Sequence, residues 1–207
     1  MKLSYAGAGV ALILAATLAA CGGKAQFTLQ GTVDNLRNSG LVLANGNDTV
    51  SVPAGATSFT FPQQIDYGTT YNITVKTDPA HMNCQIGGGS GSAGHTVTIQ
   101  AQVVCNQNTY TLGGLFTGLT AAADGTARTV TLLNGSTGGA VTISSASGTL
   151  GAGDFVFGTQ VADGQSYGVT VVKPDVANGL TCTVANGTGV MHEAAVSNLI
   201  LTCVPTP

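Results

Sequence analysis

The feature that most constrains the fold of this chain is an internal repeat. Residues 27–106 and residues 110–204 carry the same short motifs in the same order. The matched motifs are Phe27-Thr28-Leu29 with Tyr110-Thr111-Leu112, Asn45-Gly46 with Asn134-Gly135, Phe59-Thr60-Phe61 with Phe155-Val156-Phe157, Tyr71-Asn72-Ile73 with Tyr167-Gly168-Val169, and Cys84 and Cys105 with Cys182 and Cys203. A sequence that repeats one unit folds as copies of one structural unit. We therefore expect two domains of the same fold in tandem.

Each copy consists of short apolar runs in which every second residue is polar. Tyr71, Ile73 and Val75 alternate with polar residues in this way, which is the pattern of a half-buried β-strand. About seven such runs in each copy predict an all-β protein made of two tandem immunoglobulin-like (Ig-like) β-sandwich modules. The core tryptophan and widely spaced cysteines of true immunoglobulin domains are missing, so the prediction concerns architecture only. A small two-sheet or barrel-like module of another topology is the alternative.

Charge is scarce in this chain. Charged residues make up only 7% of it, compared with about 25% in typical globular proteins. Glycine occurs 30 times, and together with abundant β-branched residues this favours an all-β protein outside the cytoplasm. The formal net charge is −3 and no basic cluster occurs, so nucleic-acid binding lacks its electrostatic signature. Tryptophan is absent, which disfavours a site that binds sugars by tryptophan stacking.

The first 20 residues have the pattern of a secretory signal peptide. Lys2 supplies a positive charge, and residues 6–20 are uncharged and mostly apolar, like the n-region and h-region of such signals. The apolar stretch is shorter than the roughly 20 residues that a transmembrane helix needs, which disfavours a retained membrane span. Residues 1–20 are therefore predicted to be a signal peptide that is removed on export.

Leu18-Ala19-Ala20-Cys21, at the end of this stretch, resembles the lipobox of bacterial lipoproteins. The resemblance implies that Cys21 is lipidated, that the signal is cut just before it, and that acyl chains such as palmitate hold the protein on a membrane. Residues 21–26 would then form a short lipidated tether. Gly22 stands where enteric lipoproteins of the inner membrane carry Asp, so the resemblance favours the outer membrane. The alternative is an ordinary cleaved signal that leaves Cys21 free.

The other four cysteines predict two disulfides. Four cysteines allow three pairings, and the repeat favours the pairing in which each copy holds its own bond, Cys84 with Cys105 and Cys182 with Cys203. Export to an oxidising compartment favours both bonds. Each would close a loop of about 22 residues and stabilise its module by about 3 kcal/mol. No Cys-x-x-Cys motif is present, which disfavours redox or metal chemistry at these thiols.

The histidines are candidate metal ligands. His81 and His95 lie on either side of Cys84, and we expect them at the same end of the first module, where Asp78 could join them. A zinc site needs three or four converging ligands, and neither the spacing nor the second copy supplies such a set. No metal site is therefore expected, and His192-Glu193 is predicted to be a loop pair.

Catalytic motifs are also missing from the sequence. Gly87–Gly94 lacks the Gly-Lys-Ser/Thr of a phosphate-binding loop and is predicted to be a flexible hairpin loop. Most acidic residues stand beside glycine or asparagine, where aspartate commonly stabilises turns, and no Gly-x-Ser-x-Gly occurs. We therefore expect no catalytic residues, no cofactor and no enzymatic activity.

The repeat pattern, from Tyr/Phe-Thr-Leu-x-Gly to the paired cysteines, resembles tandem modules in exported proteins of Gram-negative bacteria. The resemblance covers residues 27–204 and implies Ig-like modules in the cell envelope. A connection of about four residues, 106–109, predicts an elongated rod of limited flexibility. We predict a membrane-anchored lipoprotein with a structural, adhesion-like or protein-interaction role and an envelope or surface partner. The alternative is an envelope module that binds a glycan or small ligand through loops at one end of the sandwiches.

Overall fold

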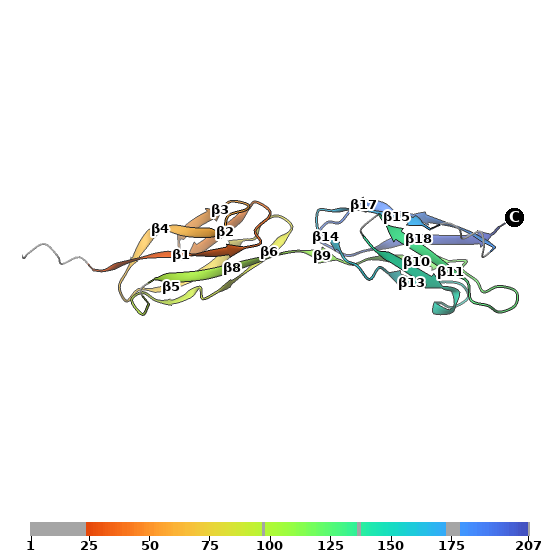
Figure 1. Cartoon of the computed structure of the whole chain (residues 1–207), viewed down its shortest axis with the longest axis horizontal. Coiled ribbons are helices and arrows are strands. Elements are labelled where there is room, and N and C mark those ends of the chain that lie inside the picture. Colours follow the sequence, from red (N-terminus) through yellow and green to blue (C-terminus); the bar gives the residue numbers. More distant parts are fainter. Residues whose placement is uncertain (1–23, 97, 136–137, 173–178, 207) are drawn as a thin grey trace, which may run out of the picture.

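The structure is a computed structural model that describes residues 24–96, 98–135, 138–172 and 179–206. These residues are built almost wholly from β-strands, and the 3₁₀ turn Ser145–Ser147 is the only helical element among them. The predicted all-β class is confirmed. Two β-sandwiches follow one another along an elongated rod (Figure 1). The predicted signal peptide 1–20 and lipidation site Cys21 lie outside the described residues.

Module 1, residues 26–107, packs two four-stranded sheets face to face. The order of the first sheet is β4 (Ser58–Asp66), β1 (Gln26–Asp34), β8 (Ile99–Gln107) and β6 (Met82–Gly87). The order of the second is β3 (Asp48–Val52), β2 (Leu41–Asn45), β5 (Thr70–Thr77) and β7 (Ser90–Ser92). Neighbouring strands are antiparallel except β1 and β8, which run parallel.

Module 2, residues 109–205, repeats this arrangement strand for strand. One sheet has the order β13 (Gly153–Val156), β10 (Leu112–Thr117), β18 (Val196–Pro205) and β16 (Leu180–Ala185). The other has the order β12 (Ala140–Ser144), β11 (Thr129–Asn134), β15 (Ser166–Val171) and β17 (Thr188–Val190). A short pair, β9 (Thr109–Tyr110) and β14 (Val161–Ala162), completes the module. β10 and β18 are the parallel pair.

The predicted sandwich architecture is confirmed, and the structure supplies the strand order. In an immunoglobulin constant domain the first strand pairs with the second, and the last strand lies in the other sheet. Here the first strand of each module lies between the fourth main strand and the last one. The two modules are thus Ig-like in layering, with their own order of strands.

Each module has its own hydrophobic core, formed by alternate residues of its strands. Leu29, Ile99 and Val103 fill the core of module 1, and the corresponding apolar residues of β10 and β18 fill that of module 2. The repeated aromatic motif places two phenylalanine rings edge to face in each core. The ring centroids are 5.9 Å apart for Phe59 and Phe61 and 6.4 Å apart for Phe155 and Phe157. Rings in this arrangement attract one another in addition to burying apolar surface.

The repeated Asn-Gly motif joins neighbouring strands. In module 1 the side-chain oxygen of Asn45 accepts a hydrogen bond from the backbone N–H of Asn72, at 2.9 Å. In module 2 Asn134 accepts the equivalent bond from the N–H of Gly168, also at 2.9 Å. This bond explains why the motif recurs. The asparagine side chain at the turn attaches its strand to a neighbouring strand of the same sheet, β5 in module 1 and β15 in module 2.

The two disulfides join neighbouring strands inside the cores. Cys84 pairs with Cys105 and Cys182 with Cys203, each across a sequence separation of 21 residues. The pairing predicted from the repeat is confirmed. Such bonds persist in oxidising compartments, so they indicate that the chain works outside the cytoplasm.

The glycine-rich run Gly87–Gly94 contains a strand, which corrects the prediction of a flexible loop. β7 lies within it and pairs with β5. A Cβ atom on Gly91 would lie 2.6 Å from the hydroxyl oxygen of Tyr71, and one on Gly89 would lie 2.8 Å from the carbonyl oxygen of Ile73. The glycines thus allow a close approach to β5, where larger residues would collide.

Candidate functional site

The two modules meet at a joint in which only Asn108 separates β8 from β9. The N–H of Asn108 donates to the carbonyl oxygen of His81 in module 1, at 2.9 Å. The carbonyl oxygen of Asn108 accepts from the N–H of Asp163 in module 2, also at 2.9 Å. The connection is shorter than the predicted four residues. Asn108, the one residue between the two strands, is hydrogen-bonded to both modules.

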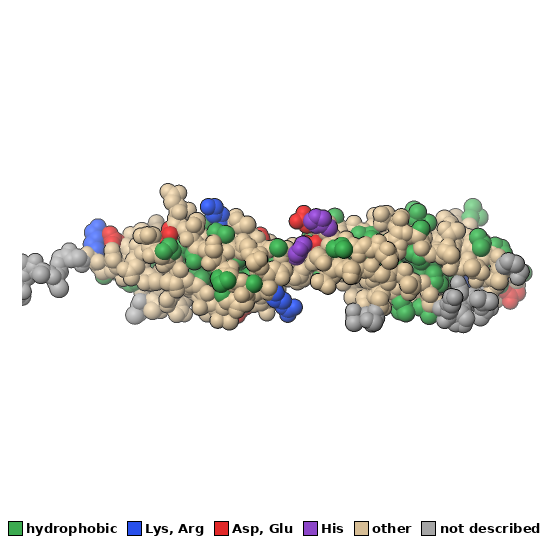
Figure 2. Space-filling view, turned by 90° about the horizontal axis from the view of Figure 1, so that it is seen from above, with side chains coloured by type: hydrophobic (Ala, Val, Ile, Leu, Met, Phe, Trp, Pro, Cys, Tyr) green, Lys and Arg blue, Asp and Glu red, His purple; other side chains and the backbone are tan. Residues whose placement is uncertain are grey.

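A side-chain pair reinforces this backbone connection. His81 Nδ1 and Asp163 Oδ2 lie 3.0 Å apart, and the side chain of Asp163 is only 1% exposed. The other carboxylate oxygen of Asp163 accepts from the N–H of Glu193 at 2.9 Å. Gln107 Nε2 donates to the carbonyl oxygens of His81 and Asp163, at 2.9 and 3.1 Å. Both modules therefore contribute to one continuous hydrogen-bond network. Figure 2 shows histidine and acidic side chains gathered where the two modules meet.

The network keeps the Asp163 carboxyl ionised. The N–H of Glu193 is the main cause that lowers the pKa of Asp163, and the hydrogen bond and charge of His81 lower it further. Burial acts in the opposite direction but does not reverse the shift. At neutral pH the joint thus holds a buried carboxylate with partners on both of its oxygens.

The backbone around the joint makes room for this pair. His81 adopts a positive φ of 62° and Gly164 one of 79°, a region in which glycine is favoured. A Cβ atom on Gly164 would lie 3.1 Å from the His81 ring. Gly164 therefore lets the histidine lie against the turn that carries Asp163.

The repeat shows which parts of the joint are specific to it. In the repeat, Gly179 corresponds to His81 and Tyr67 corresponds to Asp163. The backbone bonds recur at the outer ends of the modules, where Thr206 N–H donates to Gly179 at 3.0 Å and Tyr67 N–H donates to Ala25 at 2.8 Å. The His-Asp pair stands only where one module meets the other. These two side chains thus distinguish the joint from an ordinary module end.

A surface hollow of about 590 Å³ lies over the joint. Its lining includes Asp78, His81, Asp163 and Glu193. Asp78 is engaged within module 1, where it accepts from the N–H of Cys84 at 2.7 Å. Across the described residues, no group of three or more His, Cys, Asp or Glu side chains could hold a metal ion. The residues around this hollow therefore attach the two modules to each other.

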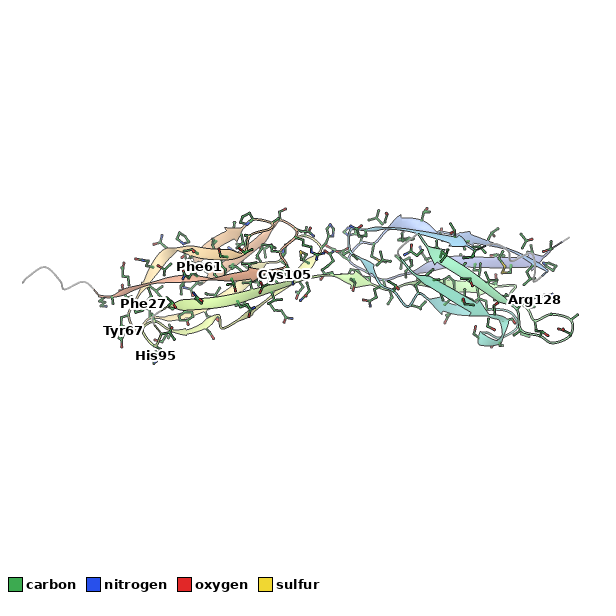
Figure 3. All side chains as sticks on the ribbon, in the orientation of Figure 1. Phe27, Phe61, Tyr67, His95, Cys105 and Arg128 are labelled. Carbon is green, nitrogen blue, oxygen red and sulfur yellow. A yellow bond between two sulfur atoms is a disulfide. The ribbon has the colours of Figure 1, made fainter. Side chains whose placement is uncertain are left out.

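The structure separates the two histidines that the sequence places on either side of Cys84. His95 lies at the far end of module 1, with Phe27 and Tyr67, while Cys105, the partner of Cys84, lies near the joint (Figure 3). The expectation that His81 and His95 share one end is wrong, because the chain between them runs the length of the module. The predicted loop pair His192-Glu193 does lie in a loop, and its Glu193 N–H contacts Asp163.

Asp163 is the residue of the joint that the sequence analysis missed. Because it stands beside Gly164, the sequence predicts only a turn residue there. A signal was present in the repeat, because a buried aspartate in module 2 replaces an exposed tyrosine, Tyr67, in module 1. A position at which two copies of one unit differ this strongly marks a contact that only one copy makes.

A second hollow offers a place for the alternative function. It has a volume of about 460 Å³ and lies on module 2, where β14 and the start of β15 line it. Asn134, Thr159, Gln160, Ser166 and Tyr167 contribute to its wall. All of these side chains are polar and can hydrogen-bond, as hydroxyl-rich ligands require.

Acidification is expected to loosen the joint. Because the pKa of Asp163 is lowered in the folded chain, its carboxylate stabilises the joint fully above the ordinary value of 3.8 and loses this effect as the pH falls through the folded value. Small-angle X-ray scattering from about pH 5 to about pH 2 should show the rod becoming more flexible. Asp163→Asn should be loose throughout, whereas Asp154→Asn, an exposed control, should behave like the parent. If the flexibility of Asp163→Asn changed with pH in the same way as that of the parent, this role would be contradicted.

Comparison with known proteins identifies no family. No family model and no curated protein sequence matches this chain. Among solved structures, the chain is similar to the major pilin T3.2 of Streptococcus pyogenes, with 11% identity, a TM-score of 0.33, and coverage of 88% of this chain and 98% of that chain. A second major pilin of that organism, T-13, gives 12% identity, a TM-score of 0.30, and coverage of 89% and 98%. Similarity at this level carries no argument about function.

Proposed function

We propose that this protein is a lipid-anchored spacer of the bacterial cell envelope, whose two sandwiches form a stiff rod that presents module 2 away from the membrane. The observation that carries the proposal is the joint, in which Asn108 is bonded to both modules and Asp163 is buried against His81. A flexible linker would leave the modules free to rotate, because relative motion is the default between domains with small contacts. A hydrogen-bonded joint suits a protein that must hold a fixed length.

Membrane anchoring is the other half of the proposal. The fold begins at Gln26, five residues after the lipobox cysteine Cys21, so a lipid there would keep module 1 close to the membrane. Among the described residues, no helix has the length and apolar character to cross a membrane. Metabolic labelling with a palmitate analogue should mark the parent and leave Cys21→Ser unlabelled. Labelling of both forms, or of neither, would refute anchoring through Cys21.

Stiffness can be measured directly by NMR relaxation on the exported chain carrying Cys21→Ser. We expect the amides of the two modules to report one common, anisotropic tumbling time, because the rod moves as a unit. Inserting Gly-Ser-Gly after Asn108, or combining His81→Gly with Asp163→Ser, should give each module its own shorter time. The control is Asp154→Asn, far from the joint. Independent tumbling in the parent would refute the spacer function.

The side of the outer membrane on which the rod lies determines which partners it can contact. Protease digestion of intact cells, followed by immunoblotting with a periplasmic control protein, separates the two cases. Cleavage while the control survives would place module 2 at the cell surface, in contact with other cells or surfaces. Protection until the outer membrane is opened would place it in the periplasm, facing envelope proteins.

The second candidate function is binding of a glycan or small polar ligand. The hollow lined by Asn134, Gln160 and Tyr167 supports it, because amides and hydroxyls meet there. A glycan array should then give hits that Gln160→Ala, a change at an exposed position, removes without lowering the melting temperature. An array without hits, together with no ligand-induced melting shift, would eliminate this function.

A further inference from the structure

One outer face of module 2 exposes four large apolar side chains to solvent. The sheet β13-β10-β18-β16 buries one face in the core and exposes the other. The exposed face carries Leu115 on β10, Val156 on β13, and Ile200 and Val204 on β18, which are between 42% and 56% exposed. Leu115 and Ile200 are direct cross-strand neighbours.

Module 1 provides a matched comparison, because it has the same fold. The strand registers place Thr32, Thr60, Gln102 and Asn106 at the positions of these four apolar residues. All four are polar and exposed. The fold itself therefore does not require apolar residues at these positions. Their presence in module 2 calls for another reason, and exposed apolar patches of this kind mark interaction sites.

The patch is nearly free of charge. Ala185 lies opposite Ile200, and threonines at positions 117, 183 and 202 separate Ile200 from Val204. Asp154, on the edge strand β13, is the only charged residue at an outward position of these four strands. A partner selected by charge would find nothing to bind here. An identical copy of this face would meet no repulsion, because the single carboxylate lies at the edge.

We infer that this face of module 2 docks against the same face of a second copy of the chain. Two sheets can pack face to face about 10 Å apart with their apolar side chains interdigitated. A two-fold axis through the face would bring Leu115 and Ile200 of one chain against those of the other, the self-complementary contact of most homodimers. β13 and β16 are the edge strands of the sheet, so Asp154, although it lies opposite Leu115, would stand at the margin of the contact within reach of water.

The size of the face sets the strength of the contact. Four strands about 4.8 Å apart, each with about six residues in the sheet, cover about 400 Å² per copy. Two copies would bury about 800 Å² of this projected area, which is at the weak end of specific interfaces. We expect a dissociation constant of roughly 0.1 to 1 mM in solution. Anchoring in a membrane, which rests on the proposed function, would raise the local concentration and favour the dimer.

Sedimentation equilibrium of the exported chain carrying Cys21→Ser, from about 0.01 to about 2 mM, tests this inference. The parent should pass from monomer to dimer across this range. The variant carrying Leu115→Thr, Val156→Thr, Ile200→Gln and Val204→Asn, the residues of module 1, should associate at least tenfold more weakly. Its melting temperature should stay within a few degrees, because all four sites are exposed.

The control removes apolar residues that lie off this face. Leu150→Ser and Val190→Thr are exposed positions elsewhere on module 2, and their double variant should dimerise like the parent. NMR spectra recorded on dilution should shift at β10, β13 and β18. A parent that stays monomeric at about 2 mM, a four-site variant that dimerises unchanged, or dilution shifts on another face would each overturn the inference. Tumbling of the dilute monomer tests the spacer function separately, so the two can fail independently.

Discussion

Replacing Gly114 with alanine is expected to unfold module 2 while module 1 stays folded. Gly114 lies on β10, beside β18 in the parallel pair, and a Cβ atom there would lie 2.6 Å from the carbonyl carbon of Leu199. The obstruction is backbone, which cannot rotate away as a side chain can. Leu199 is also fully buried, so separating the strands would open the core. We expect a loss of about 3 kcal/mol or more in the free energy of unfolding of module 2.

The equivalent change in module 1 gives the reciprocal result. A Cβ atom on Gly31 would lie 2.6 Å from the ring of Phe59 and would overlap the backbone of Ala101. Gly31→Ala should therefore unfold module 1 and spare module 2. Gly87→Ala and Gly168→Ala are the controls, because nothing lies within 4 Å of an added Cβ and neither residue has a positive φ. Two-dimensional NMR spectra with urea titrations would follow each module, and normal folding of Gly31→Ala and Gly114→Ala would refute the packing argument.

Removing a disulfide is expected to have the second large effect on the stability of a module. The double variant Cys182→Ala and Cys203→Ala should lose about 3 kcal/mol in the free energy of unfolding of module 2, because the bond closes a loop across 21 residues of sequence and restricts the unfolded chain. Both cysteines are buried in the core, and alanine leaves a small cavity that adds to the loss. The midpoint of the guanidinium transition of module 2 should fall while that of module 1 stays constant.

Reducing agent supplies the cross-check for this prediction. Dithiothreitol should lower the stability of both modules in the parent, and of module 1 alone in the Cys182→Ala and Cys203→Ala variant. The mirror variant, Cys84→Ala with Cys105→Ala, should exchange the roles of the modules. If a reduced module is as stable as an oxidised one, the bonds contribute nothing to folding and their place in the core has another purpose.

Which residues face the core could be predicted from the sequence, because alternation along a strand places every second side chain on one face. Tyr71, Ile73 and Val75 illustrate this, since their alternation predicts one shared apolar face and all three lie in or against the core of module 1. The disulfide pairing followed from the repeat in the same direct way. The order of strands could not be predicted, because alternation gives the face of a residue but not its neighbour across the sheet. The parallel pairing of β1 with β8 is therefore information from the structure alone.

The partner of Asp163 at the joint could not be predicted for a related reason. His81 and Asp163 stand 82 positions apart, and each resembles a turn residue in its own sequence context. Their contact depends on how two folded modules are oriented, which local patterns do not encode. The apolar face of module 2 was visible in part, since Leu115 and Ile200 break the alternation that Thr32 and Gln102 keep. Without the registers, however, Leu115 and Ile200 could not be recognised as neighbours across the sheet.

The parallel pair of strands has a mechanical consequence. The chain enters module 1 through β1 and leaves it through β8, and these two strands are paired from Leu29 with Ile99 to Asp34 with Val104. Tension along the rod would pull the adjacent strands in opposite directions, so that it loads their hydrogen bonds together in shear. A hairpin pulled from its open end would instead release its bonds one after another. Module 2 repeats the arrangement with β10 and β18. In each sandwich, the hydrogen bonds of the parallel pair therefore resist stretching together.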